Sequence, residues 1–447
     1  MIQRSLKDLI DGMPSPVMLH SVLREHFSDC ERLNRLRDAY CCRSAVTGRM
    51  RSPGLPNNRI AHPFARYIVA VTTGYLIGKP AAYSGGEQSA TLDAILEAYS
   101  QDSMPAVDAE NARNAAIYGR GVEYVHTDED GLPHVVALSP LDAFVVYEDN
   151  YEMRPLFGVY CIPRRREDGA MDGWRVWVMN AAQVAEYYAS DLNGGAFEEV
   201  ALSPHYFGGV PLVEYWNDED ECGDFEWVLP LIDAYDALQS DRVNDKEQFV
   251  NALLVLTGCT LETDERGREP WRQLREDKAL CLPDSQSKAE YLAKQMNESD
   301  VEVLRRALAE DIHKLSMVPD LSDESFAANA SGVAMRYKLW GLEQLVNVKQ
   351  RWFIEGLRQR LRLYARFLEL RGFPALEVAE VRISLSRAMP ANLLEQAQIA
   401  KLAENAASVE TRVRILHQGD EWSEDDVRKE VERIGAERAR DGEPHSA

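Results

Sequence analysis

The sequence predicts an α+β protein that is predominantly helical, with one β-rich region between two mainly helical regions. Apolar residues recur at helical spacing through much of residues 1–100 and 225–447, whereas residues 120–215 contain short β-branched and aromatic runs bounded by turn-forming clusters. The chain has 447 residues, of which 45% are hydrophobic. It is therefore long enough for about three domains of roughly 150 residues, and its composition excludes a mostly disordered protein.

The formal net charge is −23, from 50 Lys and Arg against 73 Asp and Glu. Proteins that hold nucleic acid over a broad surface need clustered Lys and Arg, so any contact with DNA must be local or non-adhesive. The seven cysteines include no Cys-x-x-Cys pair, which is typical of a reducing cytoplasm. No apolar stretch approaches the roughly 18 to 20 residues of a membrane span, and the N-terminus is polar. We therefore expect neither secretion nor a membrane partner.

The N-terminal half is predicted to contain helices followed by one sheet. Amphipathic segments around residues 19–40 and 60–77 are separated by a break that contains Pro and Gly at residues 52–56. Residues 128–131, Asp-Glu-Asp-Gly, are typical of a hairpin turn. The predicted strands, all in one sheet, are 122–126, 135–138, 174–178 and 183–188, and the domain is predicted to end near Trp216.

A helix of about 27 residues is predicted from Pro230 to Leu256. Its middle, residues 239–248, is polar on nearly every side, which favours contact with neighbouring subunits and water. The charged segment 260–293 is broken by Gly and Pro and has a weak strand pattern at residues 279–282. It is predicted to project between two helices.

A capping box at residues 299–302 predicts the start of the next helix, and Pro319 ends it. A loop at residues 320–331 then precedes a very long helix, residues 333–370. We expect this helix to kink at one of its glycines, Gly341 or Gly356. A strand at residues 381–385 and helices that begin at Pro390, Ser408 and Ser423 complete the chain.

Two groups of side chains on the long helix have structural interpretations. The basic stripe is predicted to be solvated or to lie at a subunit interface rather than to bind phosphate, and the aromatic group to lie in the core rather than to stack on a ligand. The stripe is Arg358, Arg360, Arg362 and Arg366, and the aromatic group is Trp340, Trp352 and Phe353.

The sequence contains no motif for catalysis. Gly74 and Gly78-Lys79-Pro80 resemble a phosphate loop, but their spacing is one residue short and Pro80 replaces the Ser or Thr that would hold magnesium. The nine histidines are scattered, so no metal site is expected. No Gly-x-Ser-x-Gly elbow or kinase signature occurs, and we assign no catalytic residue and no cofactor.

Several short segments, in this order, resemble the portal proteins of tailed double-stranded DNA bacteriophages, of the siphophage type. They span nearly the whole chain, and the departures lie mainly at residues 259–296. The segments are Asn58–Val69, Gly74–Pro80, Ala116–Gly121, Asp323–Met335 with the helix from Leu339 to Leu357, Met389–Asn392 and Ala407–Thr411.

The resemblance implies a portal fold with an α/β wing, a helical stem, a small clip, a tunnel loop with a long kinked helix, and a helical crown. The implied bounds are wing 1–224, stem helices 225–258 and 297–318, clip 259–296, tunnel loop 319–331, long helix 332–371 and crown 372–447.

The resemblance also implies function and partners. It implies a non-enzymatic dodecameric ring at one capsid vertex of the virion, assembled in the host cytoplasm. DNA would pass through this channel without sequence specificity, during packaging by the large terminase subunit and during ejection. Scaffolding and major capsid proteins and a head-completion adaptor would be further partners.

The site residues that we infer belong to three groups. The groups are Asp320, Asp323, Glu324, Asn329 and Ser331 as DNA-facing residues of the tunnel loop, Gly332 and Gly341 as a hinge, and Glu265, Arg266, Arg268 and Glu269 as the clip surface that docks the motor or adaptor.

The alternative function is an acidic cytoplasmic enzyme with an unrecognised carboxylate site, which no motif supports.

Overall fold

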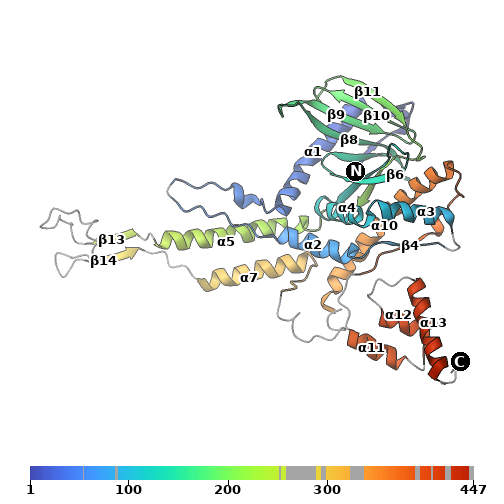
Figure 1. The fold of residues 1–447 in the computed structure, drawn as a ribbon. Helices are drawn as coiled ribbons and strands as arrows, with labels where there is room; N and C mark the ends of the chain where they lie inside the picture. The colour runs from blue at the N-terminus through green and yellow to red at the C-terminus, as the bar shows by residue number, and fades with distance from the viewer. Residues whose placement is uncertain are drawn as a thin grey trace. The chain divides into compact units, whose positions relative to one another are not determined.

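The computed structural model confirms the α+β class, with more helix than strand among the residues that it describes (Figure 1). The chain forms two compact units. The first comprises Met1–Cys41, Pro63–Leu229 and His313–Ala447, and the second comprises Cys42–His62 and Pro230–Ile312. The described residues are 1–53, 55–85, 89–250, 253–257, 288–292, 298–322, 337–387, 393–403, 406–417 and 424–441.

A six-stranded sheet in the first unit has the order β1-β7-β8-β9-β10-β11. Helix α1 (Pro16–Tyr40) packs on one face through Leu19, Val22 and Leu23, against Phe144 and Phe157 of the sheet. Ser15 caps this helix by accepting from the Met18 backbone N–H. The strands are β1 (Ile2–Arg4), β7 (Ala143–Glu148), β8 (Pro155–Arg165), β9 (Met171–Met179), β10 (Gln183–Ala189) and β11 (Phe197–Pro204).

The prediction of a single sheet was wrong. The predicted hairpin is present as β5 (Arg120–Thr127) and β6 (Pro133–Leu138), but it pairs with β12 (Leu212–Trp216) in a separate sheet of order β12-β5-β6. Apolar and polar residues alternate in the same way along the strands of both sheets, so this alternation could not show which strands pair. An apolar cluster that includes Val122, Val145 and Leu212 packs the two sheets together.

Helices α2 (Phe64–Ile77), α3 (Ala90–Gln101) and α4 (Met104–Tyr118) precede the hairpin, and α10 (Trp340–Leu370) returns to contact α2, α3 and β12. Gly356 of α10 permits one of these contacts, because a Cβ atom there would lie 2.5 Å from the ring of Tyr215. Gly356 is therefore a packing glycine, and α10 continues through it rather than ending there.

Arg360 of α10 is completely buried, so its predicted solvated or interface position was wrong. Its Nη1 atom lies 2.8 Å from Asp108 Oδ1 and 3.2 Å from Glu123 Oε2. Tyr215 donates a hydrogen bond to Glu123 Oε1 at 2.7 Å, and Asn111 donates to Oε2 at 2.8 Å. A buried guanidinium requires such partners, because an isolated buried charge is very costly.

The aromatic predictions for α10 were partly correct. Phe353 is buried beside Tyr215, and Trp352 packs against Trp216. Trp340 is 62% exposed and lies outside the core.

The remaining short elements of the first unit include a strand pair formed by residues far apart in the sequence. The strand predicted at residues 381–385 is present as β15 (Arg382–Ser384), which pairs with β4 (Ala82–Ser84). The helix predicted to begin at Ser408 is present as α12 (Val409–Leu416), and Ser408 caps it by accepting from the Thr411 backbone N–H. No helix among the described residues is long and apolar enough to cross a membrane. The remaining short elements of the first unit are β2 (Leu9–Ile10), β3 (Met13–Pro14), β4 (Ala82–Ser84), β15 (Arg382–Ser384), α11 (Leu393–Leu402), α12 (Val409–Leu416) and α13 (Glu424–Asp441).

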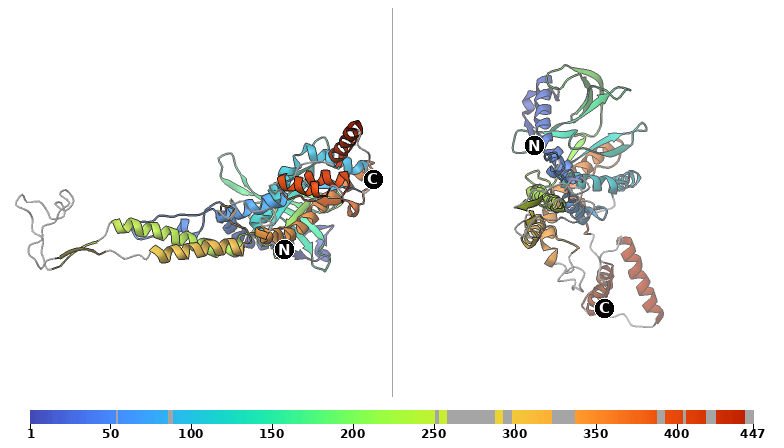
Figure 2. Two further views of the ribbon diagram at one scale, coloured as in Figure 1. Left: turned by 90° about the horizontal axis from the view of Figure 1, so that it is seen from below. Right: turned by 90° about the vertical axis from the view of Figure 1, so that its left-hand side faces the viewer.

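The second unit contains α5 (Leu229–Val250) and most of α7 (Glu298–Leu315), which lie side by side (Figure 1 and Figure 2). The predicted helix to Leu256 was too long, because β13 (Leu253–Thr257) pairs antiparallel with β14 (Lys288–Leu292). The weak strand pattern at 279–282 lies outside the described residues. Helix α7 begins at Glu298, so Ser299 lies inside its first turn rather than capping it.

The Arg360 cluster predicts a pH-dependent stability. Burial raises the pKa of Glu123 to about 7, so between pH 4.5 and 7 the folded state holds a proton that the unfolded state releases. The free energy of unfolding should therefore decrease as pH rises through this interval. In Glu123→Gln, which mimics the protonated form, urea denaturation at a series of pH values should show a smaller decrease. Glu129→Gln, at an exposed turn residue, serves as the control; equal slopes in both variants would contradict this role for Glu123.

Candidate functional site

Three polar side chains of α5 form a buried row, which we call the ladder. Asp236, Ser240 and Asn244 are spaced four residues apart and therefore lie on one face of the helix. All three are completely buried. Buried polar groups need hydrogen-bond partners, so the ladder must be covered by something polar.

The cover is residues 42–62 of the same unit, which we call the strap. The backbone N–H groups of Asn58, Ile60 and His62 donate to Asn244 Oδ1 at 2.6 Å, Ser240 Oγ at 2.9 Å and Asp236 Oδ1 at 2.9 Å, respectively. Alternate residues of an extended chain are about 6.6 Å apart, and four helical residues advance about 6 Å. The two spacings match closely, so the strap runs antiparallel to α5 with one hydrogen bond at each step.

Other contacts hold the beginning of the strap on α5. Ser44 donates from its hydroxyl to Asp236 Oδ2 at 2.7 Å, so this one carboxylate binds near both ends of the strap. Arg49 and Arg51 both pair with Asp241, the former at 2.7 Å. The polar middle of α5, which we predicted to face neighbouring subunits and water, is thus covered in part by its own chain.

Ion pairs join the other side of α5 to α7. Arg242 lies 3.2 Å from Glu298 and 3.0 Å from Glu302, and Lys246 lies 2.7 Å from Glu298. Arg305 also donates to the Tyr235 hydroxyl at 3.3 Å. The charged pairs are partly exposed, and such pairs usually contribute less than about 1 kcal/mol each. The buried ladder is therefore the stronger determinant of this unit.

Of the residues predicted to face DNA, Asp320 lies in the described part of the chain. Asp320 is exposed, and its Oδ1 accepts from the backbone N–H of Ser322 at 2.9 Å and from its hydroxyl at 2.6 Å. Its carboxylate therefore shapes the turn at 320–322. The other predicted loop, hinge and clip residues lie outside the described part of the chain: Asp323, Glu324, Asn329, Ser331, Gly332, Glu265, Arg266, Arg268 and Glu269.

Gly341 is the second residue of α10, and the helical break before it falls at Leu339. A Cβ atom added to Gly341 would meet nothing closer than 3.7 Å, the nearest atoms being those of Met317. Packing within the chain therefore does not require a glycine at this position. Its role as a hinge stays a prediction.

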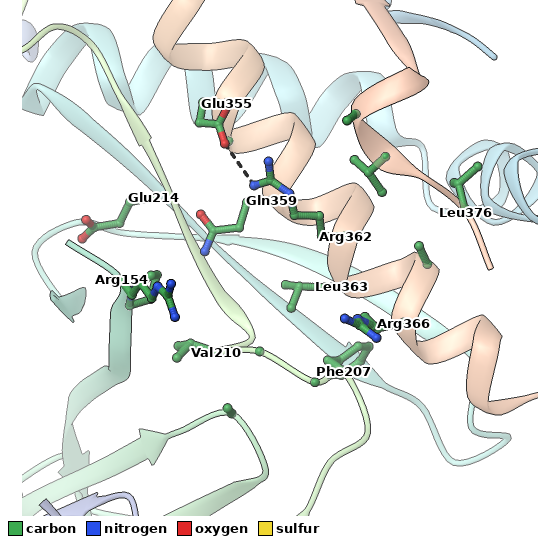
Figure 3. A pocket seen from close by; sticks show the side chains of 18 of the residues that line it. Arg154, Phe207, Val210, Glu214, Glu355, Gln359, Arg362, Leu363, Arg366 and Leu376 are labelled. Atoms are coloured by element: carbon green, nitrogen blue, oxygen red, sulfur yellow. Dashed lines mark hydrogen bonds and ion pairs between the residues drawn. The ribbon is translucent and has the colours of Figure 1, made fainter. Parts of the chain in front are cut away.

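The first unit has a groove of about 1150 Å³ between α10, β12 and nearby loops (Figure 3). Its apolar lining includes Phe207, Val210, Leu363 and Leu376. The arginines of the lining lie close to carboxylates in the pairs Arg154–Glu152 at 2.8 Å, Arg362–Glu355 at 3.0 Å and Arg366–Glu369 at 3.5 Å.

Glu214, at one side of this groove, already has three donors. It accepts from the Val145 backbone N–H, the Tyr147 hydroxyl and the Trp216 indole N–H. Burial raises the pKa of this carboxyl group. Among the described residues, no group of three or more His, Cys, Asp or Glu side chains is placed to hold a metal ion. The described lining of the groove thus combines apolar side chains with charged side chains that are paired with one another.

The ladder was missed at the sequence level. Polar residues four apart in the middle of a helix were visible, but the segment that binds them is about 180 residues earlier in the chain, and no local pattern links the two.

The ladder predicts that removing one hydroxyl loosens the strap. Ser240→Ala should leave the Ile60 N–H buried without a partner and lower the free energy of unfolding by about 1–3 kcal/mol. Hydrogen exchange at residues 57–62 should become faster. Val243→Ala, on the exposed side of the same helix, should change stability by less than about 0.5 kcal/mol. Unchanged exchange in Ser240→Ala would contradict the assigned bonds.

Comparison with known proteins adds independent information. The chain matches the family described as phage portal protein, SPP1 Gp6-like, over residues 19–444. The portal protein of Bacillus phage SPP1 is 23% identical over 331 residues, which cover 71% of this chain and 64% of that protein. The portal protein of Clostridium phage phiCD119 is 22% identical over 245 residues, 54% of this chain and 52% of that protein. This chain therefore aligns with less than two thirds of either relative.

Solved structures of gene transfer agent particles are also similar. A chain from the neck of an empty particle has a TM-score of 0.42 at 12% identity, covering 85% of this chain and 92% of its own. A chain from the native virion has a TM-score of 0.43 at 12% identity, with coverages of 80% and 91%. The family match extends over almost the whole sequence and agrees with the resemblance seen in its motifs. The chain belongs to the SPP1 Gp6-like family of phage portal proteins.

Proposed function

We propose that this chain is the subunit of a portal ring at one vertex of a phage capsid, with a location in the virion after assembly in the host cytoplasm. The family match over residues 19–444 carries this proposal. In this role the ring is the channel through which terminase packages DNA, in which DNA is retained, and from which DNA leaves toward the tail. The family supports this function and not an acidic enzyme.

The charge of the chain agrees with a conduit. Tight DNA binding depends on phosphate contacts from many Lys and Arg residues, and this chain has a net charge of −23. A channel that must let DNA slide benefits from walls that do not hold phosphate. We therefore propose passage without sequence specificity and without a catalytic step in this subunit.

We propose that the wing comprises the two sheets with α1 to α4, and that the stem comprises α5 and α7. We propose that the stem also includes the strap, and that the clip begins with β13 because α5 ends at Val250. The tunnel loop at 319–331, the long helix and the crown keep their proposed bounds.

The partners proposed are further copies of this chain in a dodecameric ring, the large terminase subunit, scaffolding and major capsid proteins, and a head-completion adaptor. Terminase and the adaptor would dock on the clip. The antiparallel pairing of β13 with β14 supports treating these two strands and the residues between them in the sequence as one clip.

Ring formation is the first test of this function. Purified protein should form rings of the portal type in negative-stain micrographs and have a light-scattering mass many times that of one chain. A monodisperse species at 50.5 kDa, the mass of one chain, would contradict the proposal.

A second test concerns the clip. Reversing the charges of Glu265, Arg266, Arg268 and Glu269 together should leave the rings intact and weaken terminase binding, because a charged segment is suited to a polar, reversible contact. Pull-down of terminase by preformed rings measures this. A matched control reverses Glu198 and Glu199 at the exposed edge strand β11. If only the control weakened binding, the docking surface would lie on the wing.

A further inference from the structure

The end of α7 is held by aromatic residues of α2, within the first unit. His313, in the last turn of α7, makes edge-to-face contacts with Phe64 and Tyr67, with ring centroids 5.9 Å and 5.6 Å away. Its Nδ1 atom forms a hydrogen bond with the Val318 carbonyl at 2.9 Å. The chain therefore turns sharply after α7 and returns toward α2.

The Tyr67 hydroxyl completes this turn. It donates to the Pro319 carbonyl at 2.8 Å and accepts from the Leu321 backbone N–H at 2.9 Å. One oxygen atom thus bonds the backbone on both sides of Asp320. Burial raises the pKa of Tyr67 above its ordinary value, so the hydroxyl keeps the proton that it donates.

The turn is also packed and conformationally constrained. Val318 is completely buried and Ser316 nearly so. Met317 has a φ of 58°, the left-handed region that a residue with a side chain rarely adopts. On its other side Met317 faces the start of α10, since its Cβ lies 3.7 Å from the position of a Cβ at Gly341. Met317 and Gly341 thus lie close together in the first unit.

We propose that Tyr67, supported by His313, is the positioning residue that fixes the course of the backbone at residues 319–322. This inference rests on the proposed function, in which that segment begins the tunnel loop. Neither residue was among the predicted sites, because Tyr67 is in a helix about 250 residues earlier. The proposed role is to orient the loop for DNA passage, independently of ring assembly.

Tyr67→Phe tests this role, because it removes only the hydroxyl and keeps the ring beside His313. Hydrogen exchange at Leu321 in the assembled ring should become about tenfold faster, while the amount of ring stays unchanged. Tyr75→Phe is the matched control, since Tyr75 lies on the same helix and its hydroxyl binds Glu343 rather than residues 319–321. In this control, exchange at Leu321 should equal that of the wild type.

The functional measurement is the yield of DNA-filled particles from capsid, terminase and rings of each variant. We expect the yield to fall several-fold in Tyr67→Phe and to stay near wild type in Tyr75→Phe. Unchanged exchange at Leu321, or faster exchange with a normal yield, would overturn the positioning role. If wild-type rings themselves supported no packaging while Leu321 exchange still responded to Tyr67→Phe, the proposed function would fail instead.

Discussion

The buried guanidinium of Arg360 is the constraint around which the first unit is built. It requires carboxylates, and Asp108 from α4 and Glu123 from β5 supply them, so three elements must meet at one point. Gly356, one helical turn earlier in α10, allows the ring of Tyr215 to approach, and the Tyr215 hydroxyl then reaches the same Glu123. Replacing a buried ion pair by apolar groups can be neutral for stability, whereas removing one partner is costly. The cluster therefore specifies how α10 lies on β12 more than it contributes net stability.

Sequence reasoning could predict elements but not their long-range pairing. Residues 128–131 identified the hairpin because turn chemistry is local, and Ser408 identified a helix start for the same reason. The division of the strands into two sheets could not be predicted, because β12 pairs with β5, a strand about 90 residues earlier, and no local pattern links the two. The burial of Arg360 was not predicted, because a charged side chain is expected to be exposed unless its buried partners are known. Those partners, Asp108 and Glu123, are about 240 residues earlier in the chain. The strand β13 was assigned to a helix because a short apolar run fits either structure.

Helix α5 shows how a polar face of a helix can be buried without a neighbouring subunit. The polar side chains of a helix need hydrogen-bond partners, but these partners need not be water. In α5 the backbone of the strap provides them. Backbone N–H groups at alternate positions are a good match for acceptors four residues apart on a helix. The cost of burying Asp236, Ser240 and Asn244 is offset by satisfied hydrogen bonds, and their arrangement allows only one register for the strap.

The motifs that carry the family resemblance are also the places where distant segments meet. Asn58, Ile60 and His62 bind the ladder, and Tyr67, in the same motif, binds the turn after α7. In the next motif, Gly121 lies against the backbone of Asn111, which leaves no space for a side chain. Asn58 and His62 also bind through their side chains, to Asn244 and Asp236, and Tyr67 binds through its hydroxyl, so substitutions at these positions remove tertiary contacts. A fold of this kind is therefore recognisable at low overall identity, while segments with exposed, locally satisfied residues can diverge.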